Sequence, residues 1–375
     1  MLGIVTPYKV VNYGTKLQAY AMQQLMSKYD DVELLGFVPA TDKRIGSILG
    51  KVYLKLSRKF QKKSTTTQIN ELKKRAEVIN QFDSNYQFGR IIKGNEALKQ
   101  ELKKYKAIVC GSDQLWAPSN VIADYFTLTI IPDEINKFSY ASSFGISQIP
   151  NNMIGRYRKF LSRLDYISVR EEQGKEIVKS VAGKDAEVVL DPTLMLDEDE
   201  WSSLAAKSKI NVEESYIFCY FLGETQAHRD FARELAKVKS LKLVTIPHFK
   251  GWNIADEDFG DIQVYEAGPI EFLNLIKHAV YVCTDSFHST VFSIIFKRQV
   301  AVFERFKKGS SESTNSRIYT ILTNLGLEDQ LYNDEKDIEK FISNIIDFSQ
   351  VSIKLDGLKN KSFAYLDKAI GSKRR

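Results

Sequence analysis

Short apolar runs alternate along the chain with longer segments whose apolar residues recur at helical spacing. Most of the runs are four to seven residues long, contain β-branched or aromatic side chains, and are apolar on both faces. This pattern is typical of parallel strands covered by helices on both sides. The predicted strands are residues 3–6, 32–37, 107–110, 137–142, 166–169, 187–189, 216–221, 241–247 and 279–284.

The segments between these runs predict helices, and strict alternation of strand and helix favours an α/β fold with doubly wound parallel sheets. A short acidic helix and a linker interrupt the alternation at 197–211. We therefore predict one Rossmann-like domain over residues 1–205, a second over 206–350, and a C-terminal helix and tail over 351–375. The predicted helices are residues 17–28, 96–104, 151–164, 172–180, 230–239, 270–278 and 289–296.

The composition is that of a globular protein of the cytoplasm. Hydrophobic residues make up 43% and charged residues 27% of the 375 residues, which excludes disordered and fibrous classes. Cys110, Cys219 and Cys283 lie within apolar runs, as reduced thiols in a core do. No run approaches the ~18–20 apolar residues of a membrane span. The first residues resemble a strand rather than a signal peptide.

One segment stands apart by its charge. Residues 43–63 contain eight Lys or Arg and no Asp or Glu, and their apolar residues recur at helical spacing, which predicts a basic amphipathic helix. Such a helix either buries its apolar face on its own domain or lies on anionic lipid, as a peripheral contact at the inner face of the membrane. Nucleic acid is not an expected partner, because no recognition motif accompanies the charge.

Polar segments follow many of the predicted strands. In open parallel sheets, ligands bind outside the carboxyl ends of the strands, so these segments are expected to line one cleft. They are residues 12–14, 111–114, 143–145, 170–171, 191–193 and 285–288.

Together with their neighbours, these segments resemble the motifs of the polysaccharide pyruvyl transferase family. They occur in the family's order and extend from residue 3 to about residue 325. One departure is Ser289, which stands where the family usually has glycine. The matching segments are 12–14 with 17–21, 111–116, 139–145, 168–171, 190–193, 284–290 and 315–318.

The resemblance implies a fold and a reaction. The implied fold is two Rossmann-like domains facing across a cleft, as in GT-B glycosyltransferases, with the acceptor on the first domain and the donor on the second. The implied reaction transfers pyruvate from phosphoenolpyruvate to two hydroxyls of a sugar in a cell-surface polysaccharide or its lipid-linked precursor. A cyclic ketal forms, phosphate is released, and no cofactor is expected.

Phosphoenolpyruvate carries a phosphate and a carboxylate, so its site needs cationic groups and N–H donors. The guanidinium groups of Arg170 and Arg317 match such oxygens. The N-terminus of the helix that follows residue 286 is a second anion site. With the family's motifs, these features predict a donor site formed by Arg170, Arg317, Ser286, Ser289 and Thr290.

Proton transfer is assigned to a different set of residues. His288 is the histidine that lies at a strand–helix junction inside a polar motif, and imidazole exchanges protons near neutral pH. Asp285, Asp113 and Glu171 are its possible partners. The sequence leaves open which group is the acid and which is the base.

The acceptor is predicted to contact Asn12, Tyr13, Gly14 and Gln18, because amide and phenol groups suit sugar hydroxyls. The alternatives are a tight turn at Gly14 and a solvated helix face at Gln18. Trp116 is either a platform for a sugar or a core residue. No metal is expected, since neither Asp-x-Asp sequence, at 197–199 or 256–258, directly follows a strand or is flanked by His or Cys ligands.

Two other functions compete with pyruvyl transfer. One is a GT-B glycosyltransferase that uses a nucleotide sugar, but no carboxylate for a ribose and no pocket for a base is evident. The other is a non-catalytic carbohydrate- or anion-binding protein, which a shared fold does not exclude.

If residues 43–63 form a membrane-surface helix, the protein will sediment with anionic liposomes. Salt will release it, because ions screen exposed charges. Replacing Lys55, Lys59 and Lys62 by Glu will abolish sedimentation. Binding that survives these substitutions, or that never occurs, would instead support a helix packed on its own domain.

Overall fold

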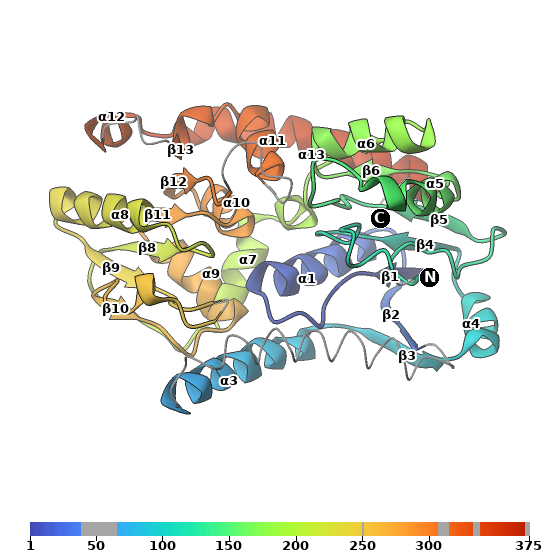
Figure 1. Cartoon of the computed structure of the whole chain (residues 1–375), viewed down its shortest axis with the longest axis horizontal. Helices are drawn as coiled ribbons and strands as arrows, with labels where there is room; N and C mark the ends of the chain where they lie inside the picture. Colours follow the sequence, from blue (N-terminus) through green and yellow to red (C-terminus); the bar gives the residue numbers. More distant parts are fainter. Residues whose placement is uncertain (39–65, 123, 250, 307–314, 333–337, 372–375) are drawn as a thin grey trace.

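The computed structural model of the chain contains two larger parallel sheets, one in each half of the sequence (Figure 1). It describes residues 1–38, 66–122, 124–249, 251–306, 315–332 and 338–371. The first sheet has the strand order β3-β2-β1-β4-β5. Its strands are β1 (Leu2–Val5), β2 (Val32–Val38), β3 (Phe88–Lys93), β4 (Ala107–Cys110) and β5 (Asn136–Ser139).

The second sheet has the strand order β10-β9-β8-β11-β12-β13, and its strand pairs are also parallel. A short parallel pair, β6 (Ser168–Val169) and β7 (Glu187–Val188), joins β5 through a bridge between Phe138 and Tyr166. The strands of the second sheet are β8 (Tyr216–Tyr220), β9 (Lys242–Thr245), β10 (Ile262–Gln263), β11 (Tyr281–Thr284), β12 (Gln299–Phe303) and β13 (Leu331–Tyr332).

Helices connect successive strands in both halves. α7 (Glu198–Ala205) precedes the second sheet and packs against α9 of that half. α12 (Ile338–Ser343) follows the last strand of the second sheet. The other connecting helices are α1 (Tyr13–Ser27), α4 (Asn95–Leu102), α5 (Ile154–Ser162), α6 (Glu172–Ala182), α8 (Gln226–Lys239), α9 (Pro269–His278), α10 (Phe287–Ile295) and α11 (Ser316–Leu325).

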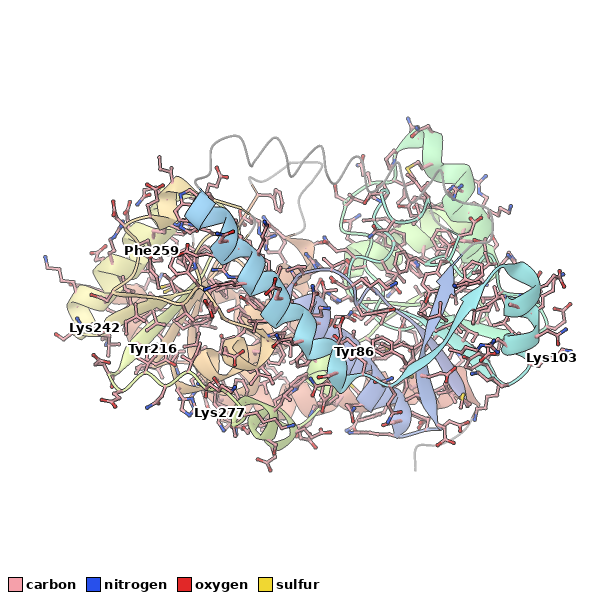
Figure 2. The ribbon with its side chains drawn as sticks, turned by 90° about the horizontal axis from the view of Figure 1, so that it is seen from below. Tyr86, Lys103, Tyr216, Lys242, Phe259 and Lys277 are labelled. Atoms are coloured by element: carbon pink, nitrogen blue, oxygen red, sulfur yellow. The ribbon has the colours of Figure 1, made fainter. Side chains whose placement is uncertain are left out.

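Two helices cross between the halves. α3 (Thr66–Gln81) lies along the underside of the second half, as Figure 2 shows from below. Its Arg75 donates to the carbonyl oxygens of Tyr265 and Pro247, each at 2.6 Å.

The last helix, α13 (Phe348–Ile370), returns to the first half (Figure 1). The hydroxyl of Tyr365 donates to the carbonyl oxygen of Ser139 in β5 at 2.7 Å. Tyr29 donates to the carboxylate of Asp367 at 2.8 Å. The chain therefore ties its two halves together at both crossings.

One apolar core passes through both halves. The ring of Tyr13 in α1 stacks on Phe272 in α9, with centroids 4.9 Å apart, and its hydroxyl donates to the carbonyl oxygen of Ala267 at 2.9 Å. Trp201 in α7 packs edge-on against Phe292 in α10 at 4.9 Å. Domains move relative to each other by default unless their interface is large and apolar. This core therefore holds the halves in one arrangement.

Each strand predicted from the sequence is present, and so is each predicted helix that falls within the described residues, with ends shifted by a few residues. Four further strands were not predicted: β3, β10, β12 and β13. β10 and β13 have only two residues each, and β3 exposes Phe88 and Ile91, so its pattern is not that of a buried strand. The basic segment 43–63 lies outside the described residues. Within the described ranges, no helix combines the length and apolarity needed to span a membrane.

Candidate active site

Loops from the carboxyl ends of the first-half strands meet the first turns of α10 and α11 from the second half. A pocket opens at this meeting point, between the end of β7 and the helices α10, α11 and α13. Its polar lining includes Arg170, Asp191 and Arg317, with Phe287 beside them. The predicted donor-site arginines therefore lie together, although 147 positions separate them in the sequence.

Arg170 contacts side chains from several segments of this region. It follows β6, and only 4% of its surface is exposed. Its Nη2 atom lies 2.8 Å from Oδ2 of Asp191 and donates to Oγ of Ser112 at 2.6 Å. Its Nη1 atom lies 3.7 Å from Oδ1 of Asp113. These partners compensate the buried charge of the guanidinium, because leaving a buried ion unpaired costs roughly 3–5 kcal/mol.

Arg317, in the first turn of α11, shares Asp113 with Arg170. Its Nη1 atom lies 3.8 Å from Oδ1 of that carboxylate. Both guanidinium groups lie over the ring of Phe287, at 4.9 and 5.5 Å from its centroid. Burial opposes ionisation of Asp113, but the two arginines lower its pKa to about 2. Asp113 is thus an anion that holds two cations close together.

His288 lies beside the same carboxylates. It is 7% exposed, and its Nε2 atom lies 3.9 Å from Oδ2 of Asp191. Burial lowers the pKa of His288 to about 4, against the opposing attraction of Asp191. The imidazole is therefore neutral at pH 7.

The first turn of α10 carries the remaining predicted donor residues. Ser286 caps the helix, and its side chain accepts from the backbone N–H of Ser289 at 3.5 Å. The hydroxyl of Thr290 is internal and donates to the carbonyl oxygen of Ser286 at 3.0 Å. Ser289 is fully buried, yet its Oγ atom has no hydrogen-bond partner among the described residues.

Several buried polar atoms without partners lie in this one region. Within the described residues, Nε2 of His288, Oγ of Ser289, Nε and Nη1 of Arg170 and Oε2 of Glu171 make no hydrogen bond. Buried polar groups in native proteins are nearly always hydrogen-bonded, so each such atom needs an explanation. A bound polar ligand that these atoms contact would satisfy them.

The predicted carboxylate partners of His288 differ in their surroundings. Both oxygens of Asp285 accept from backbone N–H groups, those of Leu222 and Gly223, each at 2.7 Å. Asp285 therefore joins the ends of β8 and β11. Glu171 accepts through Oε1 from the Ser143 hydroxyl at 2.9 Å, and burial raises the pKa of Glu171.

The predicted acceptor residues lie in and before α1, not in a loop. Asn12 caps the helix and accepts from the N–H of Thr15 at 3.0 Å. Gln18 is fully buried and donates to the Thr6 hydroxyl at 3.0 Å. Tyr13 is fully buried in the apolar core. Tyr13 and Gln18 thus have internal partners and present no surface to a sugar. Gly14 packs on His288.

Other candidates belong to the interior or to the surface. Trp116 is fully buried against Phe144 and Phe160, which makes it a core residue. His228 is buried and packs on Phe303, with ring centroids 4.6 Å apart. His278 is exposed at the end of α9.

Two site residues, Thr15 and Arg305, were missing from the sequence prediction, and two others, Ser112 and Asp191, were given no individual role. Ser112 and Asp191 lie within the predicted motifs, but nothing in their spacing predicts that both contact Arg170. Arg305 donates to the carbonyl oxygen of Asp285 at 2.9 Å. Arg305 follows the apolar run of β12, and recognising that run as a strand would have placed Arg305 at the carboxyl edge of the sheet. Among the described residues, no cluster of three or more His, Cys, Asp or Glu could hold a metal.

Solved structures with a similar fold are sugar-nucleotide enzymes. UDP-GlcNAc 2-epimerase from Neisseria meningitidis, bound to UDP-GlcNAc, aligns with a TM-score of 0.50 and 11% identity over 99% of this chain and 97% of that chain. A Listeria monocytogenes protein assigned as a UDP-N-acetylglucosamine 2-epimerase aligns with a TM-score of 0.50 and 12% identity, over 96% and 89% of the two chains. At these identities the likeness shows the fold alone, and it confirms the predicted α/β, GT-B-like arrangement.

The sequence comparisons address the family. No curated protein matches the sequence. The family model for polysaccharide pyruvyl transferase matches residues 12–305, which include most of the chain and the segments that carry Arg170 and His288. The chain belongs to the polysaccharide pyruvyl transferase family.

Proposed function

We propose that the protein transfers pyruvate from phosphoenolpyruvate to two hydroxyls of a sugar, forming a cyclic ketal and releasing phosphate. The sugar belongs to a cell-surface polysaccharide or to its lipid-linked precursor, and the reaction takes place in the cytoplasm, at the inner face of the membrane. One observation carries the proposal: within the described residues, Arg170 and the α10 residues His288 and Ser289 have buried polar atoms that make no hydrogen bond.

The chemistry of these atoms fits the donor. Guanidinium N–H groups bind phosphate and carboxylate oxygens through charge-assisted hydrogen bonds. The first turn of a helix adds N–H groups and the positive end of its dipole. Arg170, Arg317 and α10 thus offer two kinds of anion contact, and phosphoenolpyruvate has two anionic groups.

The proposed reaction starts with a proton added to the methylene carbon C3, which leaves C2 as an oxocarbenium-like centre. One sugar hydroxyl attacks C2 and loses its proton. The bond between C2 and the phosphate oxygen breaks, and the second hydroxyl closes the ketal as it loses its own proton. Of the two hydroxyl protons, one balances the proton taken up by C3 and the other leaves with phosphate or solvent.

We assign the base to His288 and the acid to Glu171. His288 is neutral at pH 7, so it can accept a hydroxyl proton. Asp285 has both oxygens occupied, and Asp113 stays ionised beside two arginines. Glu171 keeps one buried oxygen, Oε2, without a hydrogen-bond partner among the described residues. Burial raises its pKa, which favours the protonated form that an acid requires.

Phosphoenolpyruvate is expected to raise the melting temperature of the protein, because a ligand that binds only the native state stabilises it. Ser289→Ala removes a buried hydroxyl that lacks a partner. This variant should melt at the same or a higher temperature without ligand, and should gain less from phosphoenolpyruvate. Thermal unfolding with and without ligand measures both effects. A large shift with UDP- or GDP-sugars and none with phosphoenolpyruvate would instead favour a glycosyltransferase.

His288→Ala and Glu171→Gln should each lower turnover by on the order of 10²-fold or more, the usual contribution of a proton-transfer group. The assay is phosphate release from phosphoenolpyruvate with a panel of lipid-linked and nucleotide-linked sugars. Arg170→Ala should also weaken donor binding, since it removes a charge-assisted contact.

The matched control is His278→Ala, because His278 is exposed and is the last residue of α9. It should turn over like the unmodified protein. His228 is unsuitable as a control, since it is buried against Phe303. Normal turnover in the His288 variant, or a loss that only follows unfolding by circular dichroism, contradicts the assignment.

The depressed pKa of His288 also predicts how stability depends on pH. Its folded value of about 4 lies below the ordinary value of 6.5, so between these values the unfolded chain binds a proton that the folded protein does not. Stability is thus present above pH 6.5 and is lost as the pH falls toward 4. The loss amounts to about 3 kcal/mol at 1.36 kcal/mol per pKa unit.

His288→Gln should remove this loss, and denaturant unfolding at pH 7 and pH 4.5 measures it. Asp113 and Asp191, whose pKa values are lowered, act mainly below this window. The pKa of His248 is lowered and that of Glu171 is raised, but both groups are present in the two proteins. The difference between the two proteins therefore reports on His288. An equal loss in both proteins would show that His288 titrates normally.

A further inference from the structure

Within the site, the backbone of Gly14 in α1 packs against the imidazole of His288 in α10. A Cβ atom added to Gly14 would lie 2.0 Å from Nδ1, 2.4 Å from Cγ and 2.8 Å from Cε1 of His288. Real Cβ atoms essentially never approach heavy atoms this closely. The imidazole from α10 therefore rests directly on the backbone of α1.

Backbone conformation does not explain why position 14 is a glycine. Gly14 is the second residue of α1 and is not among the glycines with positive φ, so its backbone suits any residue. Glycine within a helix is less favourable than alanine, because it loses more conformational freedom on folding. The close contact with His288 is what requires the missing side chain.

The two neighbours of Gly14 also act across the site. Tyr13 anchors α1 to the second half, through its stack on Phe272 and its hydrogen bond to Ala267. The hydroxyl of Thr15 donates to Oδ2 of Asp113 at 2.7 Å, and Asp113 holds Arg170 and Arg317.

We propose that the first turn of α1 positions the side chains of the site. Because Gly14 has no side chain, the imidazole of His288 packs directly on the α1 backbone, which fixes the position of the ring. Tyr13 fixes the helix, Gly14 supports the imidazole, and Thr15 orients the carboxylate between the two arginines. On this proposal Gly14 and Tyr13 do not bind the acceptor. The geometry that carries it is independent of the donor's identity, so it does not rest on the proposed function.

The test is a double-mutant cycle between Gly14→Ala and His288→Ala. In the unmodified background, Gly14→Ala should lower the melting temperature, because the new methyl group displaces the imidazole. In the His288→Ala background, the three nearest atoms are gone. There the same substitution should raise the melting temperature slightly, as alanine replaces glycine in a helix. The change in melting temperature caused by Gly14→Ala thus differs in sign between the two backgrounds. Such non-additivity is the sign that the two residues interact directly.

Gly155→Ala is the matched control. Gly155 is the second residue of α5, as Gly14 is of α1, and an added Cβ there meets no atom within 4 Å. This substitution should raise the melting temperature slightly in both backgrounds and leave turnover unchanged. Gly14→Ala should lower turnover by on the order of 10²-fold, the cost of moving a catalytic group by about 1 Å.

A second measurement separates positioning from simple destabilisation. The imidazole C–H signal of His288 in NMR spectra should titrate near pH 4 in the unmodified protein and higher in Gly14→Ala, because the displaced ring is better solvated. Additive effects of the two substitutions, or an unmoved titration in the Gly14 variant, would overturn the proposal. Neither readout uses phosphoenolpyruvate, so both remain decisive even if pyruvyl transfer is wrong.

Discussion

The buried guanidinium of Arg170 is the group on which the rest of the site depends. It is 4% exposed, and its partners come from separate segments: Ser112 and Asp113 after β4, and Asp191 after β7. A buried charge is tolerated only when it is paired and hydrogen-bonded. The need to pair this one cation therefore fixes the ends of three strands relative to each other, and Phe287 under the guanidinium extends the arrangement to α10.

That arrangement holds because the two halves share an apolar core. Arg317 and His288 belong to the second half, whereas Asp113, Asp191 and Arg170 belong to the first. Contacts of 3–4 Å between them would be lost if the halves moved apart by a few ångströms. The stack of Tyr13 on Phe272 and the returning helix α13 oppose such movement. The site contains residues from both halves, so its geometry depends on apolar packing by residues that take no part in the reaction.

The sequence was sufficient for most of the buried parallel strands, because such a strand is apolar on both faces and the polar residue after it marks the carboxyl edge. It missed four parallel strands, among them the buried apolar strand β12. It also predicted that Arg170, His288 and Arg317 meet. It did not predict the role of Tyr13 or Gln18, since amide and phenol groups serve equally for sugars and for internal hydrogen bonds. Nor does spacing show that Gly14 supports His288, because that contact joins two helices, α1 and α10, from different halves of the chain.

The charges of the site imply that donor binding and proton affinity are linked. Arg170, Arg305 and Arg317 pair with three carboxylates, those of Asp113, Asp191 and Asp285, so the charges of the cations are already balanced. An entering anion adds negative charge that favours protonated neighbours. In the proposed reaction this raises the pKa of His288 from about 4 toward the neutral range in which a base is most effective. The histidine is a weak base in the empty site and becomes a useful one when the donor's phosphate is beside it, so that proton transfer from the sugar follows donor binding.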